Sequence, residues 1–204
     1  MNALKVTSTK LAGLLILEPC VFGDERGFFL ESYNERAMAE AGIREHFVQD
    51  NHSCSLRNVL RGLHYQIKQP QGKLVRVVEG EILDVAVDVR RSSPTFGQWE
   101  SVRLSGDNKR MFWIPVGFAH GFRVLSEKAH VMYKATDYYA PEYERTLLWN
   151  HAGLKIDWQF EDASTEDAST EDAPARVSSS GASSLIISAK DQRGVALRDA
   201  ETFD

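Results

Sequence analysis

Cysteine is scarce in this sequence, and long apolar runs are absent. Cys20 and Cys54 are the only cysteines among 204 residues, and their spacing predicts neither a disulfide framework nor a metal site. The apolar run at 11–17 ends at Glu18 and Pro19, is too short to cross a bilayer, and is followed by no signal-peptide cleavage pattern. The sequence has no run of lysine and arginine that would indicate nucleic-acid binding. We therefore expect a cytoplasmic protein with no membrane or nucleic-acid partner.

Negative charge is concentrated near the C-terminus. The net charge is −5, and six acidic residues between positions 161 and 172 leave about +1 for the rest of the chain. Glu-Asp-Ala-Ser-Thr occurs at 161–165 and again at 166–170, and small, Ser-rich sequence continues to 184. Such a composition buries too little apolar surface to order itself. It predicts a disordered insertion over 161–184, with an acidic docking segment as the functional alternative.

The full chain of 204 residues is 43% hydrophobic and long enough for one sizeable core. We expect one domain over 1–160 and a C-terminal segment, 185–204, that packs back on it. Asn34 and Gly42 predict the start and end of a helix over 35–41. Alternation and turn residues predict short strands; these cover 11–21, 28–33, 48–51, 59–65, 74–78, 82–89, 99–104, 111–115, a stretch from about 120, 131–135 and 146–150.

Many short strands with little helix predict a mainly β protein, an antiparallel jelly roll with one or two short helices. Residues 74–78 and 82–89 are predicted to form a hairpin around Glu79 and Gly80. In its second arm one face carries leucine and valine, whereas Asp84 and Asp88 share the other face with apolar residues.

The stretch 59–65 interleaves apolar residues with Arg61 and His64, and Lys73 follows shortly after. Strand alternation places Leu60, Gly62 and His64 on one side, and residues 59, 61, 63 and 65 on the other. His64 alone is most simply a hydrogen-bonded core histidine. Histidine, arginine and lysine together on a half-buried run are costly without partners or a ligand, so the cluster predicts a site.

Four kinds of chemistry fit these residue types. A metal site is disfavoured because no second histidine follows His64 and Lys73 adds a positive charge. A nucleophile triad lacks a supporting motif around Cys54. Proton transfer next to a carbonyl needs a base, a cation for the enolate and an acid, which His64, Lys73 and Tyr133 supply. A sugar- or anion-binding module would use the same residues, and residue types alone leave these last two open.

Long blocks of the sequence resemble the dTDP-4-dehydrorhamnose 3,5-epimerase family, over about residues 12 to 158. The blocks are 27–33 (GFFLESY), 49–53 (QDNHS), 59–66 (VLRGLHYQ), 73–77 (KLVRV), 84–88 (DVAVD), 93–97 (SPTFG), 113–122 (WIPVGFAHGF) and 133–142 (YKATDYYAPE). The resemblance implies a cupin-type jelly roll that acts as a homodimer with an exchanged strand and needs no metal or organic cofactor.

The resemblance also implies a reaction and a set of site residues. The enzyme would invert C3'' and C5'' of dTDP-4-dehydro-6-deoxy-D-glucose, giving dTDP-4-dehydro-L-rhamnose. His64 would remove the proton alpha to the C4'' ketone, Lys73 would stabilise the enolate, and Tyr133 would return a proton from the opposite face. The residues implied to bind the sugar nucleotide are Arg26, Phe29, Glu31, Gln49, Asn51, Arg61, His120, Tyr139 and Lys190.

The C-terminal part departs from the family pattern. The run Ser188-Ala189-Lys190-Asp191 matches a family segment whose aspartate pairs with the catalytic histidine, so Asp191 is implied to orient His64. Trp158 is followed by Gln159, where the family has proline, and the segment up to Asp191 is unusually long. Loop-closure cost grows slowly with length, so we expect Asp191 to keep its place. The alternatives are a single-centre epimerase, a 3,4-ketoisomerase and a non-enzymatic binding module.

Overall fold

The computed structural model describes residues 4–160 and 185–204. The predicted insertion at 161–184 lies outside the described residues. The strands are β1 (Lys5–Ser8), β2 (Leu15–Glu18), β3 (Val21–Asp24), β4 (Gly27–Leu30), β5 (Gln49–Leu56), β6 (Val59–Gln66), β7 (Lys73–Glu79), β8 (Glu81–Asp88), β9 (Trp99–Ser105), β10 (Met111–Ile114), β11 (Phe118–Val124), β12 (Lys128–Ala135), β13 (Glu144–Thr146) and β14 (Ile186–Ile187).

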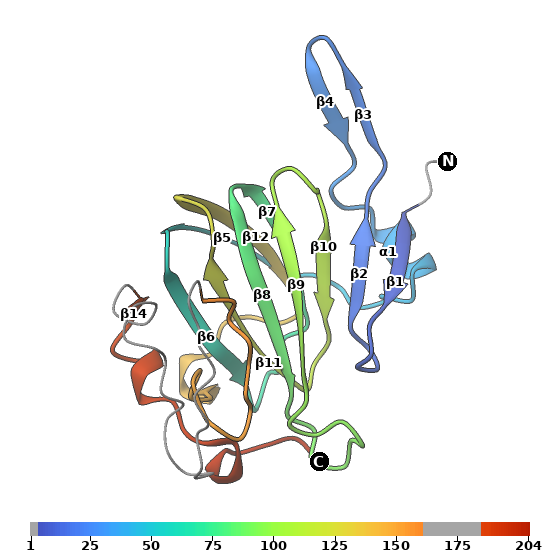
Figure 1. Ribbon diagram of the computed structural model, residues 1–204. Helices are drawn as coiled ribbons and strands as arrows, with labels where there is room; N and C mark the ends of the chain where they lie inside the picture. Colours follow the sequence, from blue (N-terminus) through green and yellow to red (C-terminus); the bar gives the residue numbers. More distant parts are fainter. Residues whose placement is uncertain (1–3, 161–184) are drawn as a thin grey trace.

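Two antiparallel sheets face each other (Figure 1). Sheet 1 has the order β1-β2-β10-β7-β12-β5, and sheet 2 has the order β13-β6-β11-β8-β9, with β14 added parallel to β6. Strands β3 and β4 form a separate hairpin that projects from the sandwich (Figure 1). The predicted mainly β, cupin-type jelly roll is confirmed.

Helical structure is short in the described part of the chain. The α-helix α1 (Glu35–Glu40) starts as predicted, because the side chain of Asn34 accepts a hydrogen bond from the backbone N–H of Ala37 at 3.2 Å. Three single-turn 3₁₀ helices cover Pro141–Tyr143, Asp191–Arg193 and Leu197–Asp199. No helix among the described residues is long and apolar enough to cross a membrane.

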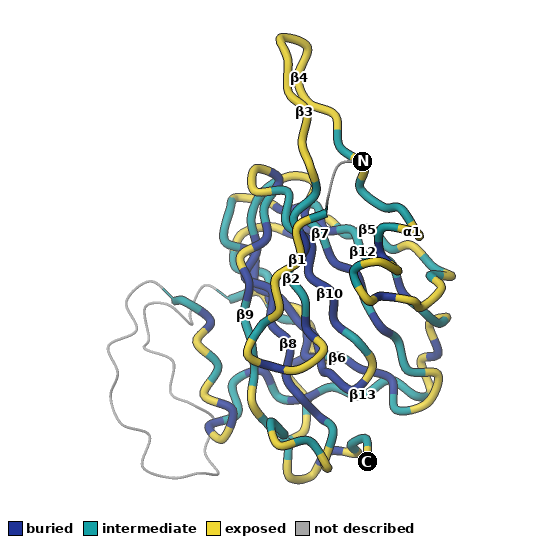
Figure 2. Tube along the Cα trace, turned by 90° about the vertical axis from the view of Figure 1, so that its right-hand side faces the viewer, coloured by how far each residue is buried: buried dark blue, intermediate teal, exposed yellow. Residues whose placement is uncertain are grey.

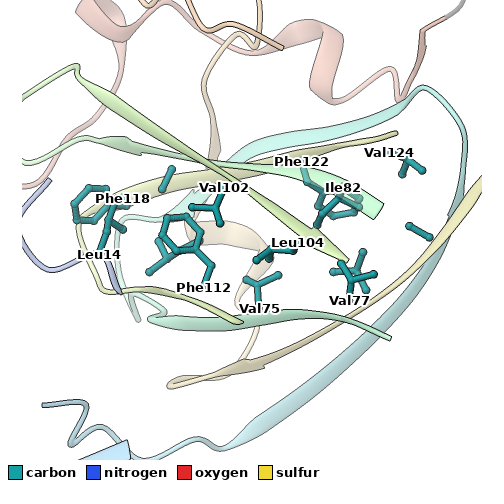
Figure 3. Packing of buried hydrophobic residues seen from close by; sticks show 14 of the residues in the cluster. Leu14, Val75, Val77, Ile82, Val102, Leu104, Phe112, Phe118, Phe122 and Val124 are labelled. Atoms are coloured by element: carbon teal, nitrogen blue, oxygen red, sulfur yellow. The ribbon is translucent and has the colours of Figure 1, made fainter. Parts of the chain in front are cut away.

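The core between the sheets is built from alternate residues of both (Figure 3). Val75 and Phe112 of sheet 1 lie between the layers with Ile82 and Phe122 of sheet 2. The opposite face of β8, with Leu83, Val85, Val87 and Val89, belongs to a second cluster that the segments after β13 cover. This alternation follows the predicted pattern and leaves β8 buried on both faces.

The predicted hairpin of 74–78 and 82–89 is wrong. β7 pairs with β10 and β12 in sheet 1, whereas β8 pairs with β11 and β9 in sheet 2. Gly80, with φ +80°, is the single residue between them, and a Cβ there would lie 2.0 Å from the carbonyl oxygen of Lys128. The chain therefore crosses between sheets at a glycine, and both strands find central positions where their apolar faces are covered.

Two other strand boundaries differ from the prediction. Residues 11–21 do not form one strand: Gly13 turns with φ +100°, β2 begins at Leu15, and β3 belongs to the separate hairpin. The strand predicted at 146–150 lies earlier, as β13, because Leu147 and Trp149 pack into the cluster that covers sheet 2. The short strand β1 was not predicted.

The C-terminal segment lies against sheet 2. β14 pairs with β6, Leu147 bridges to Val195, and Arg90 bridges to Phe203. Figure 2 shows buried stretches within this segment, in contrast to the exposed β3–β4 hairpin. The residues that carry chemistry arrive on the strands of both sheets and on this segment.

Candidate active site

His64 and Asp191 form a close pair although 127 positions separate them. His64 Nε2 lies 2.6 Å from Asp191 Oδ1, and Asp191 is 3% exposed. Ser188 Oγ accepts a hydrogen bond from the Asp191 N–H at 3.1 Å, which fixes the segment. Burial raises the pKa of Asp191, but the hydrogen bond and charge of His64 outweigh it and hold the pKa below its ordinary value. The carboxylate only accepts, so a neutral His64 donates from Nε2 and keeps the Nδ1 lone pair as a base.

Lys73 lies next to this pair, at the start of β7. Its Nζ donates a hydrogen bond to the backbone oxygen of His64 at 3.4 Å. Burial lowers the pKa of Lys73 to about 8, although the negative charges of Glu144 and Asp84 oppose the shift. An ammonium group in such a place suits the stabilisation of negative charge on oxygen.

Tyr133 reaches the same region from β12. It packs against the core between the sheets, and burial together with the charge of Glu144 raises its pKa. The phenol therefore stays neutral near neutral pH and can donate a proton. Asn51 lies directly opposite on β5, and its Oδ1 accepts a hydrogen bond from Gln49 Nε2 at 2.9 Å.

An irregularity at Gly62 corrects the predicted faces of β6. Leu60, Leu63 and Tyr65 all belong to the outer cluster of sheet 2, which strict alternation forbids. The β6–β11 register shifts beside Gly62, whose φ is +123° and whose Cβ would lie 2.5 Å from the Cα of Gly121. As a result residues 61 and 64, predicted on opposite faces, both turn toward sheet 1.

Arg61 connects the two sheets. Its Nε donates a hydrogen bond to Ser55 Oγ of β5 at 3.0 Å, and its charge acts on the phenol of Tyr133. On β11, His120 lies opposite His64 in the ladder, and its Nε2 is 2.6 Å from Asp84 Oδ1. We call His64, Lys73, Asp84, His120, Tyr133 and Asp191 the inner polar cluster.

Glu144 covers one side of this cluster and was missed in the sequence. Its Oε1 accepts a hydrogen bond from Lys190 Nζ at 2.9 Å, and its Oε2 accepts one from the Tyr139 hydroxyl at 3.1 Å. Burial raises the pKa of Glu144, but Lys190 and the nearby charge of His64 lower it overall. The only sequence signal was its position just after the block at 133–142.

Three predicted binding residues lie elsewhere within the single chain. Arg26 pairs with Asp24 at the tip of the β3–β4 hairpin, and Phe29 is 71% exposed there. Glu31 accepts a hydrogen bond from Asn34 at 3.1 Å. The structure thus brings Gln49, Asn51, Arg61, His120, Tyr139 and Lys190 near the catalytic candidates, but not the hairpin residues.

The geometry brings the His64–Asp191 pair, Lys73 and Tyr133 into one polar region of the sandwich. No group of three or more His, Cys, Asp or Glu side chains able to hold a metal ion occurs in the described ranges. Fold and site together define a class: a cupin-type jelly roll that carries histidine, lysine and tyrosine side chains in one polar cluster. The sequence model of the dTDP-4-dehydrorhamnose 3,5-epimerase family matches residues 8–199. The chain belongs to this family.

Individual relatives agree with this assignment. The dTDP-4-dehydrorhamnose 3,5-epimerase of Pseudomonas aeruginosa is 54% identical over 98% of this chain and 99% of its own length. The crystal structure of the Legionella pneumophila enzyme RmlC in complex with dTDP-4-keto-L-rhamnose has a TM-score of 0.84 and 46% identity, covering 97% and 95% of the two chains. A 3'-monoepimerase from Streptomyces bikiniensis, in complex with dTDP, has a TM-score of 0.77 and 27% identity, covering 94% and 86%. The predicted family is confirmed.

Proposed function

We propose that the inner polar cluster is the active site at which this chain inverts C3'' and C5'' of dTDP-4-dehydro-6-deoxy-D-glucose. The predicted activity, that of a dTDP-4-dehydrorhamnose 3,5-epimerase in dTDP-rhamnose biosynthesis, is confirmed by the family match and the 54% identical relative. The observation that carries the residue assignment is the 2.6 Å contact between His64 and Asp191 beside the partly buried ammonium of Lys73.

Proton removal is the first step of the proposal. His64 takes the proton from the carbon next to the C4'' ketone, the C–H electron pair forms a carbon–carbon double bond, and the carbonyl pair moves onto oxygen. The imidazole becomes imidazolium, which the carboxylate of Asp191 stabilises. Lys73 offsets the negative charge on the enolate oxygen.

Reprotonation from the other face completes each inversion. The enolate takes a proton from the Tyr133 phenol, the carbonyl re-forms, and the resulting phenolate and imidazolium exchange protons with solvent. Both stereocentres flank the same carbonyl, so one set of side chains can serve both in turn. Apart from this exchange with solvent, each proposed step uses side chains of the protein.

Binding of the nucleotide is assigned to the remaining polar residues. Arg61, His120 and Lys190 suit diphosphate or sugar oxygens, and Gln49, Asn51 and Tyr139 lie on the same side of sheet 1 or at its end. Arg26 and Phe29 on the β3–β4 hairpin, and Glu31 just after it, lie away from the inner polar cluster within one chain. We assign them to the site of a second copy of the chain.

A homodimer with hairpin exchange fits the exposed surface of β3–β4. Val21, Phe22, Phe28 and Phe29 are 42%, 46%, 60% and 71% exposed on this two-stranded hairpin. An isolated hairpin is marginally stable in water, and exposed aromatic groups favour burial against a partner. Sedimentation velocity of wild-type protein and Phe29→Asp tests this: a dimer that the substitution leaves intact contradicts the exchange. We also propose that the protein is located in the cytoplasm, as its low cysteine content predicts.

Proton-exchange NMR in deuterated water tests the reaction. Wild-type protein is expected to introduce deuterium at both C3'' and C5'' of the substrate, and His64→Ala at neither. Label at one carbon alone would indicate a single-centre epimerase, and a moved carbonyl would indicate a ketoisomerase. Binding without exchange would show a binding module and refute the proposed chemistry.

A further inference from the structure

A second imidazole–carboxylate pair, His120 and Asp84, lies on the face of sheet 2 that contacts the core. The proposed proton transfers do not involve this pair. His120 and Asp84 are 7% and 0% exposed, and their contact of 2.6 Å is as short as that of the proposed base with its own carboxylate. The β6–β11 ladder sets His120 opposite His64. The pair therefore belongs to the same end of the sandwich as the proposed base.

The two aspartates of β8, Asp84 and Asp88, differ in how their carboxylates are hydrogen-bonded. Asp88 accepts hydrogen bonds from Arg90, Ser93 and Thr95, which close the loop after the strand. Asp84 has one such partner, and its Oδ2 is fully buried with no hydrogen bond to the rest of the described chain. A buried carboxylate with so few partners is costly for folding, so its charge is expected to act on something nearby.

The nearby cation is Lys73, and charged groups reach it from several elements. Glu144 from β13 and Asp84 from β8 are negative, and Lys190 from the C-terminal segment is positive. Glu144 already contacts Lys190, so part of its charge is offset. Burial lowers the pKa of Lys73, and Asp84 is one of the two groups that raise it again.

We propose that Asp84 is a positioning residue of the proposed epimerisation: its buried carboxylate holds the ring of His120 in one orientation and keeps the Lys73 ammonium charged beside the enolate. The proposal rests on the proposed function. Because a carboxylate only accepts, Nε2 of His120 carries a hydrogen, which leaves Nδ1 of the neutral ring to accept a hydrogen bond from a substrate hydroxyl. Asp84 itself transfers no proton.

The variant Asp84→Asn removes the negative charge of the side chain and nearly preserves its size and shape. The asparagine oxygen can still accept from His120, but the negative charge is gone. We expect the alkaline limb of the pH profile of kcat to move to lower pH, because Lys73 loses its proton more easily. A fall of one unit in its pKa, from about 8, would make the loss relative to wild type about sevenfold larger at about pH 9 than at about pH 6.5, with KM nearly unchanged. A loss of equal size at every pH overturns the proposal.

Two further variants complete the experiment. Asp88→Asn removes the other buried carboxylate of β8, whose partners lie in the loop after it, so we expect lower stability and an unmoved alkaline limb. Asp84→Glu keeps the charge and should hold the limb at the wild-type pH even if kcat falls. If the alkaline limb of the kcat profile moves in Asp84→Glu, the proposal is also overturned. The experiment therefore remains decisive even if Asp84→Asn does not fold. Failure of wild-type protein to exchange deuterium would instead refute the proposed function.

Discussion

Lys73 is expected to lower the stability of the folded protein and to raise its turnover, and Lys73→Met tests both effects. Burial lowers the pKa of Lys73 from 10.5 to about 8, so at neutral pH the folded protein holds a charge in surroundings that disfavour it. Methionine has a similar length, carries no charge and suits irregular apolar space. We therefore predict a more stable protein that has lost most of its turnover.

The magnitude follows from the pKa difference. A fall from 10.5 to about 8 corresponds to about 3 kcal/mol of unfolding free energy at neutral pH. Lys73 is only partly enclosed and donates a hydrogen bond to the His64 carbonyl, so the expected gain is about 1–2 kcal/mol after that contact is lost. Loss of a cation beside a developing oxyanion should lower kcat by about 10²- to 10³-fold.

The pH dependence has a definite sign. Between about pH 8 and about pH 10.5 the unfolded chain keeps the lysine proton and the folded chain releases it, so wild-type stability rises with pH relative to the variant. The advantage of Lys73→Met should be full below about pH 8 and vanish above about pH 10.5.

Urea unfolding of both proteins across this range measures the effect, with deuterium entry as the activity assay. Lys134→Met is the matched control, since Lys134 lies on the other face of the neighbouring strand β12 and pairs with Asp50 at 3.0 Å on the surface. Its unfolding free energy should change by less than about 0.5 kcal/mol. A less stable Lys73→Met protein, or a difference independent of pH, would refute the reasoning that burial disfavours the Lys73 ammonium.

Three further predictions concern the proton path and the backbone beneath it. Asp191→Asn should lower kcat by about 10²- to 10⁴-fold in steady-state turnover, whereas Asp199→Asn on the same segment should not; unchanged turnover in the first variant would remove Asp191 from the mechanism. Tyr133→Phe should slow inversion by about 10²-fold while deuterium still enters the recovered substrate by NMR; equal loss of exchange and inversion would count against its role as the second acid. Gly62→Ala should lower the unfolding free energy by about 3 kcal/mol in urea, because its Cβ would lie 2.5 Å from backbone. Gly27 has the same φ within a degree, but a Cβ there would meet nothing within 4 Å. Similar losses of unfolding free energy in Gly62→Ala and Gly27→Ala would therefore rule out steric overlap as the cause.

Local structure was predictable where the signal lies within a few residues. The cap at Asn34 and the alternation along 82–89 both hold in the structure, because a capping hydrogen bond and a strand pleat depend on immediate neighbours. The block around His64 and the position of Lys73 likewise predicted a cluster, and the structure brings these two residues into contact.

Sheet membership was not predictable from the same pattern. Two apolar strands joined by Glu79 and Gly80 look like a hairpin, and only the packing of distant strands shows that the chain changes sheets there. The two faces of β6 were misassigned for a similar reason, since the irregularity at Gly62 depends on its close approach to Gly121 of β11.

The sequence by itself determined the residue types of the site and the mainly β class, because both follow from short-range spacing. Tertiary structure alone decided that Glu144 joins Lys190 to the site and that Asp84 is buried beside it. The pairing of Asp191 with His64 across 127 positions was implied by the family resemblance, and it is the fold that brings the two residues together. Such contacts depend on where separate segments are brought together to bury apolar surface. No local pattern encodes that, because the free energy that selects it belongs to the whole fold.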